Sequence, residues 1–271
     1  MKNRFALILI AAGACLACAT AANAGQRCDT AKPTPRVIER GLNLAQRTAA
    51  ALDAEHRQHG TRVVLLARAG QDLSKYGQHW SHVGWAYKTA EGPWRVVHKL
   101  NECGTDQSLI TRQGLGEFFL DDLWRYEAAW APPPPELQDA LWKLLQDNRR
   151  APALHQRRYS MVSYAWGTRY QQSNQWAIET LALAAEPQVQ RREQAQAWLK
   201  LKDYRPGMLR IGALTRLGGR MTAGNVAFDD HPNAQRFADR IETVTADSVL
   251  DWLQRLSAGG AAPRVALLAG S

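Results

Sequence analysis

The fold is decided by His82-Val83-Gly84-Trp85-Ala86-Tyr87, followed after a short gap by Trp94-Arg95-Val96-Val97-His98-Lys99-Leu100. Both runs are rich in β-branched and aromatic residues, which is typical of strands. Glu91-Gly92-Pro93 lies between them and supplies the residues of a turn. We therefore expect an antiparallel hairpin. If His82 lies opposite His98, both imidazoles point to the same face of the sheet, whereas a slip of one residue would separate them.

A helix is expected to begin in Ser173-Asn174-Gln175-Trp176-Ala177-Ile178-Glu179 and to run to about residue 185. Ser173 or Asn174 would cap it, because their side-chain oxygens accept the free N–H groups of the first turn. A nucleophile at a helix start, a histidine base on a strand and a further polar group that orients the base form a hydrolytic triad. Ser173, His82 and His98 suit these three roles. The alternative is a simple cap and two strand histidines with satisfied hydrogen bonds.

The remaining pattern predicts an α+β protein in which an antiparallel sheet packs against helices. The expected helices are 34–56, 136–147, 188–202 and 247–256, and the expected strands are 62–68, one within 117–130, and 240–245. Residues 159–166 are expected to be extended. Residues 204–235, which are rich in Gly and Pro, are expected to form loops.

The N-terminus has the features of a cleaved export signal. Lys2 and Arg4 precede an apolar stretch that is too short to span a bilayer, and Ala22-Asn23-Ala24 is a small-residue cleavage site. We expect a signal peptide at 1–24, a single domain at 25–256, a flexible tail at 257–271, and a periplasmic or secreted location without a transmembrane segment. Cys28 and Cys103 then remain as an even pair in an oxidising compartment, which favours a disulfide over two unpaired thiols.

The formal net charge of +9 does not by itself identify a partner. The basic residues are spread among acidic ones and form no run interleaved with aromatics, so nucleic acid is a poor candidate. The sequence has no zinc-ligand spacing and no phosphate-binding loop. Residues 228–232 place two carboxylates beside His231, but three consecutive residues rarely converge on one ion, and a helix start after a turn is the simpler interpretation. We predict no metal and no cofactor, and the sequence does not indicate an oligomeric state.

The chain resembles an exported bacterial family of unknown function, number 2145, over roughly residues 28–256. The runs that carry the resemblance are 67–73, 81–85, 94–104, 116–122, 168–176 and 225–232. That family is in turn similar to the permuted papain-like hydrolases of the NlpC type. The resemblance implies a permuted papain-like core, with His82 as the base, His98 as the orienting residue and Ser173 at the position of the nucleophilic cysteine.

The presence of serine where the related hydrolases have cysteine raises the question whether this protein is an active enzyme. A thiol needs only a modest fall in its pKa to become a thiolate at neutral pH, whereas a serine hydroxyl needs concerted removal of its proton and a strong oxyanion hole. The first hypothesis is a hydrolase or acyl transferase acting on an amide or ester bond, with the cell-wall peptide or another envelope component as partner. The alternative is an inactive papain-like module that binds a peptide, glycan or lipid in the same cleft.

Overall fold

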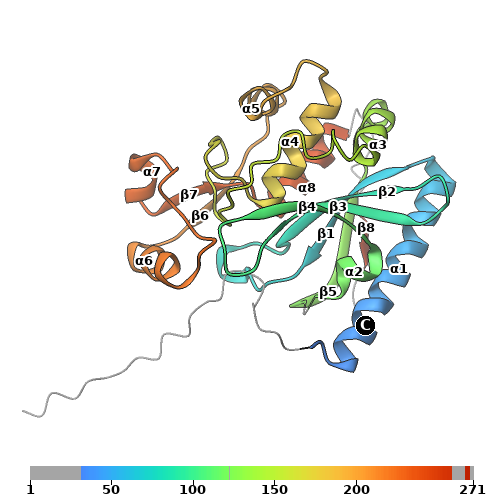
Figure 1. Cartoon of the computed structure of the whole chain (residues 1–271), viewed down its shortest axis with the longest axis horizontal. Coiled ribbons are helices and arrows are strands. Elements are labelled where there is room, and N and C mark those ends of the chain that lie inside the picture. The colour runs from blue at the N-terminus through green and yellow to red at the C-terminus, as the bar shows by residue number, and fades with distance from the viewer. Residues whose placement is uncertain (1–31, 122, 258–265, 269–271) are drawn as a thin grey trace, which may run out of the picture.

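A six-stranded antiparallel sheet forms the centre of the molecule. The computed structural model describes residues 32–121, 123–257 and 266–268. The strand order in the sheet is β4-β3-β2-β1-β5-β8 (Figure 1). The strands are β1 (Val63–Ala69), β2 (His82–Lys88), β3 (Trp94–Asn101), β4 (Ser108–Gly114), β5 (Arg125–Ala131) and β8 (Ala266–Leu268). Each neighbouring pair is antiparallel.

Helices cover both faces of this sheet, so the core has two layers of apolar side chains. The helices are α1 (Pro35–His59), α2 (Leu115–Phe119), α3 (Gln138–Gln146), α4 (Ser173–Ala185), α5 (Arg192–Leu201) and α8 (Ala246–Ser257). Even-numbered strand residues such as Val64 and Ala86 pack with α1 and α2. Odd-numbered residues such as Leu65 and Trp85 pack with α3, α4, α5 and α8. This alternation follows from the two-residue period of a strand.

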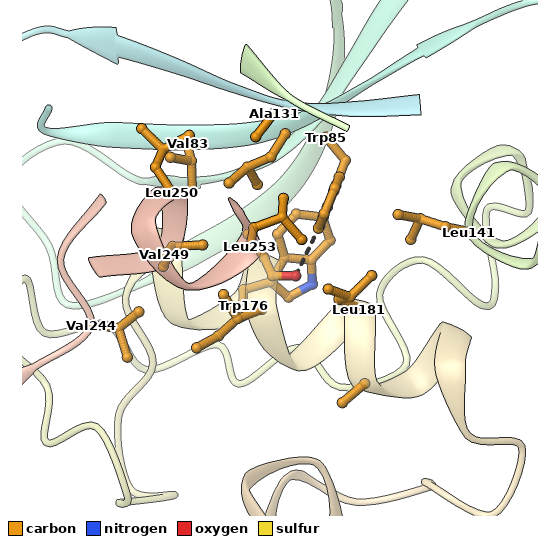
Figure 2. Close-up of a cluster of buried hydrophobic side chains, with 14 of the residues drawn as sticks. Val83, Trp85, Ala131, Leu141, Trp176, Leu181, Val244, Val249, Leu250 and Leu253 are labelled. Carbon is orange, nitrogen blue, oxygen red and sulfur yellow. Dashed lines mark hydrogen bonds between the residues drawn. The ribbon is translucent and has the colours of Figure 1, made fainter. Parts of the chain in front are cut away.

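Two tryptophans fill the space between the sheet and α4. Trp85 and Trp176 are completely buried. The indole N–H of Trp85 donates to the carbonyl oxygen of Ala177 at 2.8 Å, so the centre of α4 is held against β2 (Figure 2). Nearly every side chain of α4 is buried, which explains why its apolar residues surround the helix instead of following one stripe.

A smaller unit follows α5 in the chain. It contains the two-stranded sheet of β6 (Gly207–Arg210) and β7 (Arg240–Thr243), with α6 (Ala213–Thr222) and α7 (Asn233–Phe237) beside it (Figure 1). Two short 3-10 helices, Ser74–Tyr76 and Pro135–Leu137, complete the described elements. The small core of this unit consists of Leu209, Ile211, Phe228 and Ile241.

The α+β class and the antiparallel sheet packed against helices are confirmed. Several boundaries differ from expectation. Residues 159–166 form turns with an isolated bridge at Tyr164 instead of an extended segment. The region 204–235 contains β6, α6 and the start of α7. Leu209 of β6 and the neighbouring Ile211 pack with Ile241, which stabilises β6 in a stretch rich in Gly and Pro. Within the stretch 257–271, which was expected to be a tail, residues 266–268 pair with β5.

Three expectations fall on residues 1–31, which lie outside the described residues. They are the signal peptide, its cleavage site and the pairing of Cys28 with Cys103, and all three stay predictions. Within the described residues, no helix is both long enough and apolar enough to cross a membrane.

Candidate functional site

The two histidines of the predicted hairpin are in direct contact. His82 Nε2 lies 2.9 Å from His98 Nδ1. The register differs from the expected one, because the pairing of Trp85 with Val97 places His98 across from Gly84 and not from His82. His82 is two residues away on the same strand, so its side chain still shares the face of His98. The prediction of a common face was correct, although the predicted partner was not.

The hydrogen bonds around the histidines assign their tautomers. Gln113 Nε2 donates to Glu117 Oε1 at 3.1 Å, so Gln113 presents its carbonyl oxygen to His98 Nε2 at 2.7 Å. A carbonyl oxygen only accepts, hence His98 carries its proton on Nε2 and accepts through Nδ1. His82 therefore donates from Nε2 to His98. The lone pair of His82 Nδ1 is left without a hydrogen-bond partner in the described chain.

Both imidazoles are held in their neutral form. His98 is completely buried, and burial together with the charge of Arg68 lowers its pKa to about 3. Burial, the charge of Arg68 and the proximity of His98 hold the pKa of His82 well below its ordinary value. The Phe118 ring lies 5.9 Å from the ring of His82 and 5.2 Å from that of His98. The pair is thus a neutral base in a largely apolar setting.

Arg68 supplies the positive charge beside this pair. It lies directly across from His82 in the pairing of β1 with β2. Its guanidinium donates to the carbonyl oxygen of Phe118 and forms an ion pair with Asp121, and its Cζ atom lies 4.8 Å from the centre of the Phe118 ring. These contacts fix a buried cation where it disfavours protonation of either imidazole.

The start of α4 meets β2 beside His82. The pairing of β2 with β3 extends from Trp85 to Lys88, so the first residues of β2 are not paired with β3. The N–H of Val83 donates there to Asn174 Oδ1 at 3.0 Å. The residue after His82 is therefore bonded to the residue after Ser173. The fold brings the backbones of the two predicted motifs together, but the side chain of His82 lies with Phe118 on the α2 face of the sheet, whereas α4 packs on the opposite face.

Ser173 itself has other contacts. Its hydroxyl lies 3.5 Å from the hydroxyl of Tyr159, and the residue is 5% exposed. Burial raises the pKa of Tyr159, while hydrogen bonds with Ser173 oppose that rise. Within the described chain, the hydrogen bonds of Ser173 and of the two histidines do not join them. His82 and His98 thus form a pair, and Ser173 is near their segment without bonding to either.

The cap of α4 is also different from the expected one. Gln172, not Ser173 or Asn174, precedes the helix, and its side-chain oxygen accepts the N–H of Asn174 at 3.1 Å. The amide nitrogen of Gln172 donates to Thr243 Oγ1 at 3.3 Å and also to the carbonyl oxygen of Val244. The cap therefore ties the start of α4 to the end of β7, which leaves Asn174 Oδ1 free for β2.

A second polar cluster is buried on the α4 side of the sheet. Lys99 is completely buried and donates to the carbonyl oxygen of Gln156 at 2.5 Å and to Gln171 Oε1 at 2.9 Å. Burial and the charge of Arg192 lower its pKa to about 6, against the opposing effect of Glu179. Arg192 Nε forms a buried ion pair with Glu179 Oε2 at 2.7 Å. This cluster anchors the 147–172 connection to β3, α4 and α5.

The sequence did not reveal the partners of the histidines. Gln113 lies on β4 and Glu117 lies on α2, and the sequence predicted neither of these elements. The β-branched and apolar residues of Leu109-Ile110-Thr111, close after a turn at Gly104, were a usable strand signal. Within the described residues, no group of three or more His, Cys, Asp or Glu could hold a metal ion.

The comparison with known families now places the chain. Residues 55–253 match the model of the family described as "uncharacterized protein conserved in bacteria (DUF2145)". The chain belongs to this family. The match includes His82, His98, Gln113 and Ser173, so the whole candidate site lies inside the family region. Searches of curated proteins and of solved structures found no match.

Proposed function

We propose that this protein is a hydrolase or acyl transferase that acts on an amide or ester bond through Ser173, His82 and His98. The observation that carries the proposal is the chain of hydrogen bonds from Glu117 through Gln113 and His98 to His82, which leaves His82 Nδ1 as the free proton acceptor. The next residue of β2, Val83, bonds to Asn174 at the start of α4, while the imidazole of His82 faces Phe118 on the other side of the sheet. We also propose that the antiparallel sheet and α4 form a permuted papain-like core.

In this mechanism Ser173 Oγ attacks the carbonyl carbon of the substrate while its proton passes to His82 Nδ1. The bond to the leaving amine or alcohol then breaks, and His82 returns the proton to that group. Water, or an acceptor in a transferase, attacks the acyl-enzyme in the same way and releases the acyl product. His98 orients His82 through its Nδ1, and Gln113 fixes the tautomer of His98.

For this step the hydroxyl of Ser173 has to leave Tyr159, and it has to meet an imidazole that faces α2 across the sheet. The separation of 3.5 Å between the hydroxyls of Ser173 and Tyr159 is long for a hydrogen bond, so little energy holds Ser173 in that position. Catalytic hydrogen bonds are often long or absent before substrate binds. The low pKa of His82 keeps the base unprotonated over the whole neutral range, although it also makes the base weak.

Replacing Ser173 tests this assignment. The purified chain is treated with a fluorophosphonate probe, and hydrolysis of p-nitrophenyl acetate is followed in parallel. We expect labelling and turnover that Ser173→Ala and His82→Ala abolish, and faster turnover in Ser173→Cys because a thiol is more easily ionised. Ser74→Ala is the control, since Ser74 is an exposed serine outside the site. Turnover that survives Ser173→Ala rejects the role of this residue.

A second candidate is a module of the same fold that binds a peptide, glycan or lipid without turning it over. It is favoured by the burial of the Ser173 hydroxyl against Tyr159 and by the N–H of Asn174, which already bonds to Gln172. Such N–H groups are not free to form an oxyanion hole. This candidate predicts no turnover in the natural chain or in Ser173→Cys, together with ligand binding that survives Ser173→Ala.

Under either candidate we propose that the protein acts in the cell envelope or outside the cell. The proposal rests on the export-type segment at residues 1–24, which precedes the family region. N-terminal sequencing of the protein from cell fractions is the test. A mature chain that begins after Ala24 in the periplasm or medium supports it, and an intact Met1 in the cytosol opposes it.

A further inference from the structure

The outer edge of β4 is open beyond its start, where Gln107 forms an isolated antiparallel bridge with Arg158. In the described part of the chain β4 is the last strand on its side of the main sheet. Gln107 accepts a hydrogen bond from the N–H of Glu102 on the β3 side, whereas Asp106 accepts one from the N–H of Tyr159 on the outer side. Because successive residues of an antiparallel strand bond to opposite sides, the backbone groups of Ile110 and Arg112 face outward.

A groove of about 320 Å³ runs beside this edge. One wall consists of Ser108–Arg112, and the other is formed by residues of the segment 148–157, among them Pro152 and His155. Val97 and Ala151, both buried, make the interior apolar. The side chain of Arg112 extends toward α3, where it donates to the carbonyl oxygen of Leu145 at 2.5 Å. The groove is thus on the α3 side of the sheet, away from Gln113 and the histidine pair.

The charge of the groove is positive. Arg112 and Arg157 line it, and neither forms an ion pair with any residue in the described ranges. Glu102 is the one carboxylate among the lining residues. Burial is the main cause that lowers the pKa of His155 to about 4, and the charges of Lys99, Arg157 and Arg192 lower it further. His155 therefore lies in the same positive potential.

We propose that this groove binds an extended acidic peptide that adds to β4 as a further strand. The backbone of the peptide bonds to the outward N–H and carbonyl groups of Ile110 and Arg112, as in other cases of strand addition. A glutamate side chain on the α3 side of the peptide reaches Arg112 and Arg157. Apolar neighbours of the glutamate pack over the edge, where Leu109 is 43% exposed. The site does not depend on the catalytic proposal.

The first test measures fluorescence anisotropy of a labelled peptide, Thr-Val-Glu-Val-Thr, with the full chain. A peptide with Lys in place of Glu is expected to bind at least about tenfold more weakly, since it loses the charge-assisted hydrogen bonds to the arginines and places a like charge beside them. Two further peptides carry N-methyl groups on alternate amides. One of the two must lose binding, because one set of amides faces β4. Equal binding of both methylated peptides, or of the Lys peptide, overturns the proposal.

The second test changes the protein. Arg157→Gln and Arg112→Gln should each weaken binding of the Glu peptide by about tenfold without a comparable effect on the Lys peptide. Arg240→Gln is the matched control, because Arg240 is an exposed arginine of β7 outside the groove. Arg112 also bonds to Asn148 and Leu145, so a melting curve checks that each variant is folded. If folded Arg157→Gln and Arg112→Gln both bind the Glu peptide as tightly as the natural chain does, the groove is not the binding site and the proposal is wrong.

Discussion

Gly84 makes room for His98. A Cβ atom at position 84 would lie 2.9 Å from the Cβ of His98 and 2.7 Å from a methyl group of Val96. Both distances are shorter than van der Waals contact, so any side chain at this position would displace His98 from β3. The contact of His98 with His82 therefore depends on a residue that carries no functional group.

Replacing Gly84 by alanine should break the histidine pair. We expect Gly84→Ala to lower the free energy of unfolding by about 1–3 kcal/mol, as overpacking does in a tight core. The imidazole NMR signals of His82 and His98 should shift together. Gly218→Ala is the control, because a Cβ there meets nothing within 4 Å and alanine favours the helix. A Gly84→Ala variant as stable as the natural chain would contradict this account.

Acid should destabilise the protein through the neutral histidines. In the unfolded chain a histidine binds a proton near pH 6.5, whereas His98 in the folded chain does so at about pH 3. The unfolded state therefore binds more protons between these values, and stability falls as the pH falls from about 6.5 toward 3, by up to about 1.4 kcal/mol per pH unit for each such histidine. Above pH 6.5 this contribution is constant.

Urea unfolding at a series of pH values measures this effect. In His98→Gln the slope between pH 6.5 and pH 4 should be smaller than in the natural chain. His59→Gln, which changes an exposed histidine at the end of α1, should keep the natural slope. Equal slopes in all three chains would show that His98 is protonated as easily when folded as when unfolded.

The buried amine of Lys99 should make the stability of the protein depend on pH in the alkaline range. Its pKa is about 6 in the folded chain, against an ordinary value of 10.5. Between these values the unfolded chain binds the additional proton, so stability should rise with pH and be lost as the pH falls from 10.5 through 6. We expect the melting temperature to rise from pH 7 to pH 9.5 relative to Lys99→Met. Lys75→Met, which changes an exposed lysine, should show the same dependence of melting temperature on pH as the natural chain. If the melting temperature of Lys99→Met rose with pH as steeply as that of the natural chain, the low pKa of Lys99 would be refuted.

Breaking the buried ion pair between Glu179 and Arg192 should greatly lower the stability of the protein. Glu179 is completely buried and accepts from Arg192, Gln171 and Gln196. Glu179→Gln leaves the Arg192 charge buried without its partner, which should cost about 3–5 kcal/mol in urea unfolding. Asp203→Asn removes an equally charged partner from Arg205 in an exposed pair, and should change stability by less than about 0.5 kcal/mol. Similar effects of the two substitutions would be inconsistent with a desolvated pair at Glu179.

Much of the architecture could be predicted because it depends on local signals. The β2–β3 hairpin follows from β-branched runs that flank Gly92, and α1 follows from its helical spacing and from Thr34, whose hydroxyl accepts the N–H of Val37. α8 and β7 were also found in this way. In contrast, β8 has a weak local signal, and its place follows from its pairing with β5.

The sequence alone determined the strand of His82, the strand of His98 and a helix starting at Ser173, because strand period and turn chemistry act over a few residues. Only the tertiary structure decided which atoms meet. His98 faces Gly84 because the turn sets the hairpin register, Asn174 and not Ser173 bonds to β2 because Gln172 takes the capping position, and Gln113 reaches His98 from a neighbouring strand. Such contacts join residues far apart in the chain, and their geometry is set by the packing of the whole sheet against its helices.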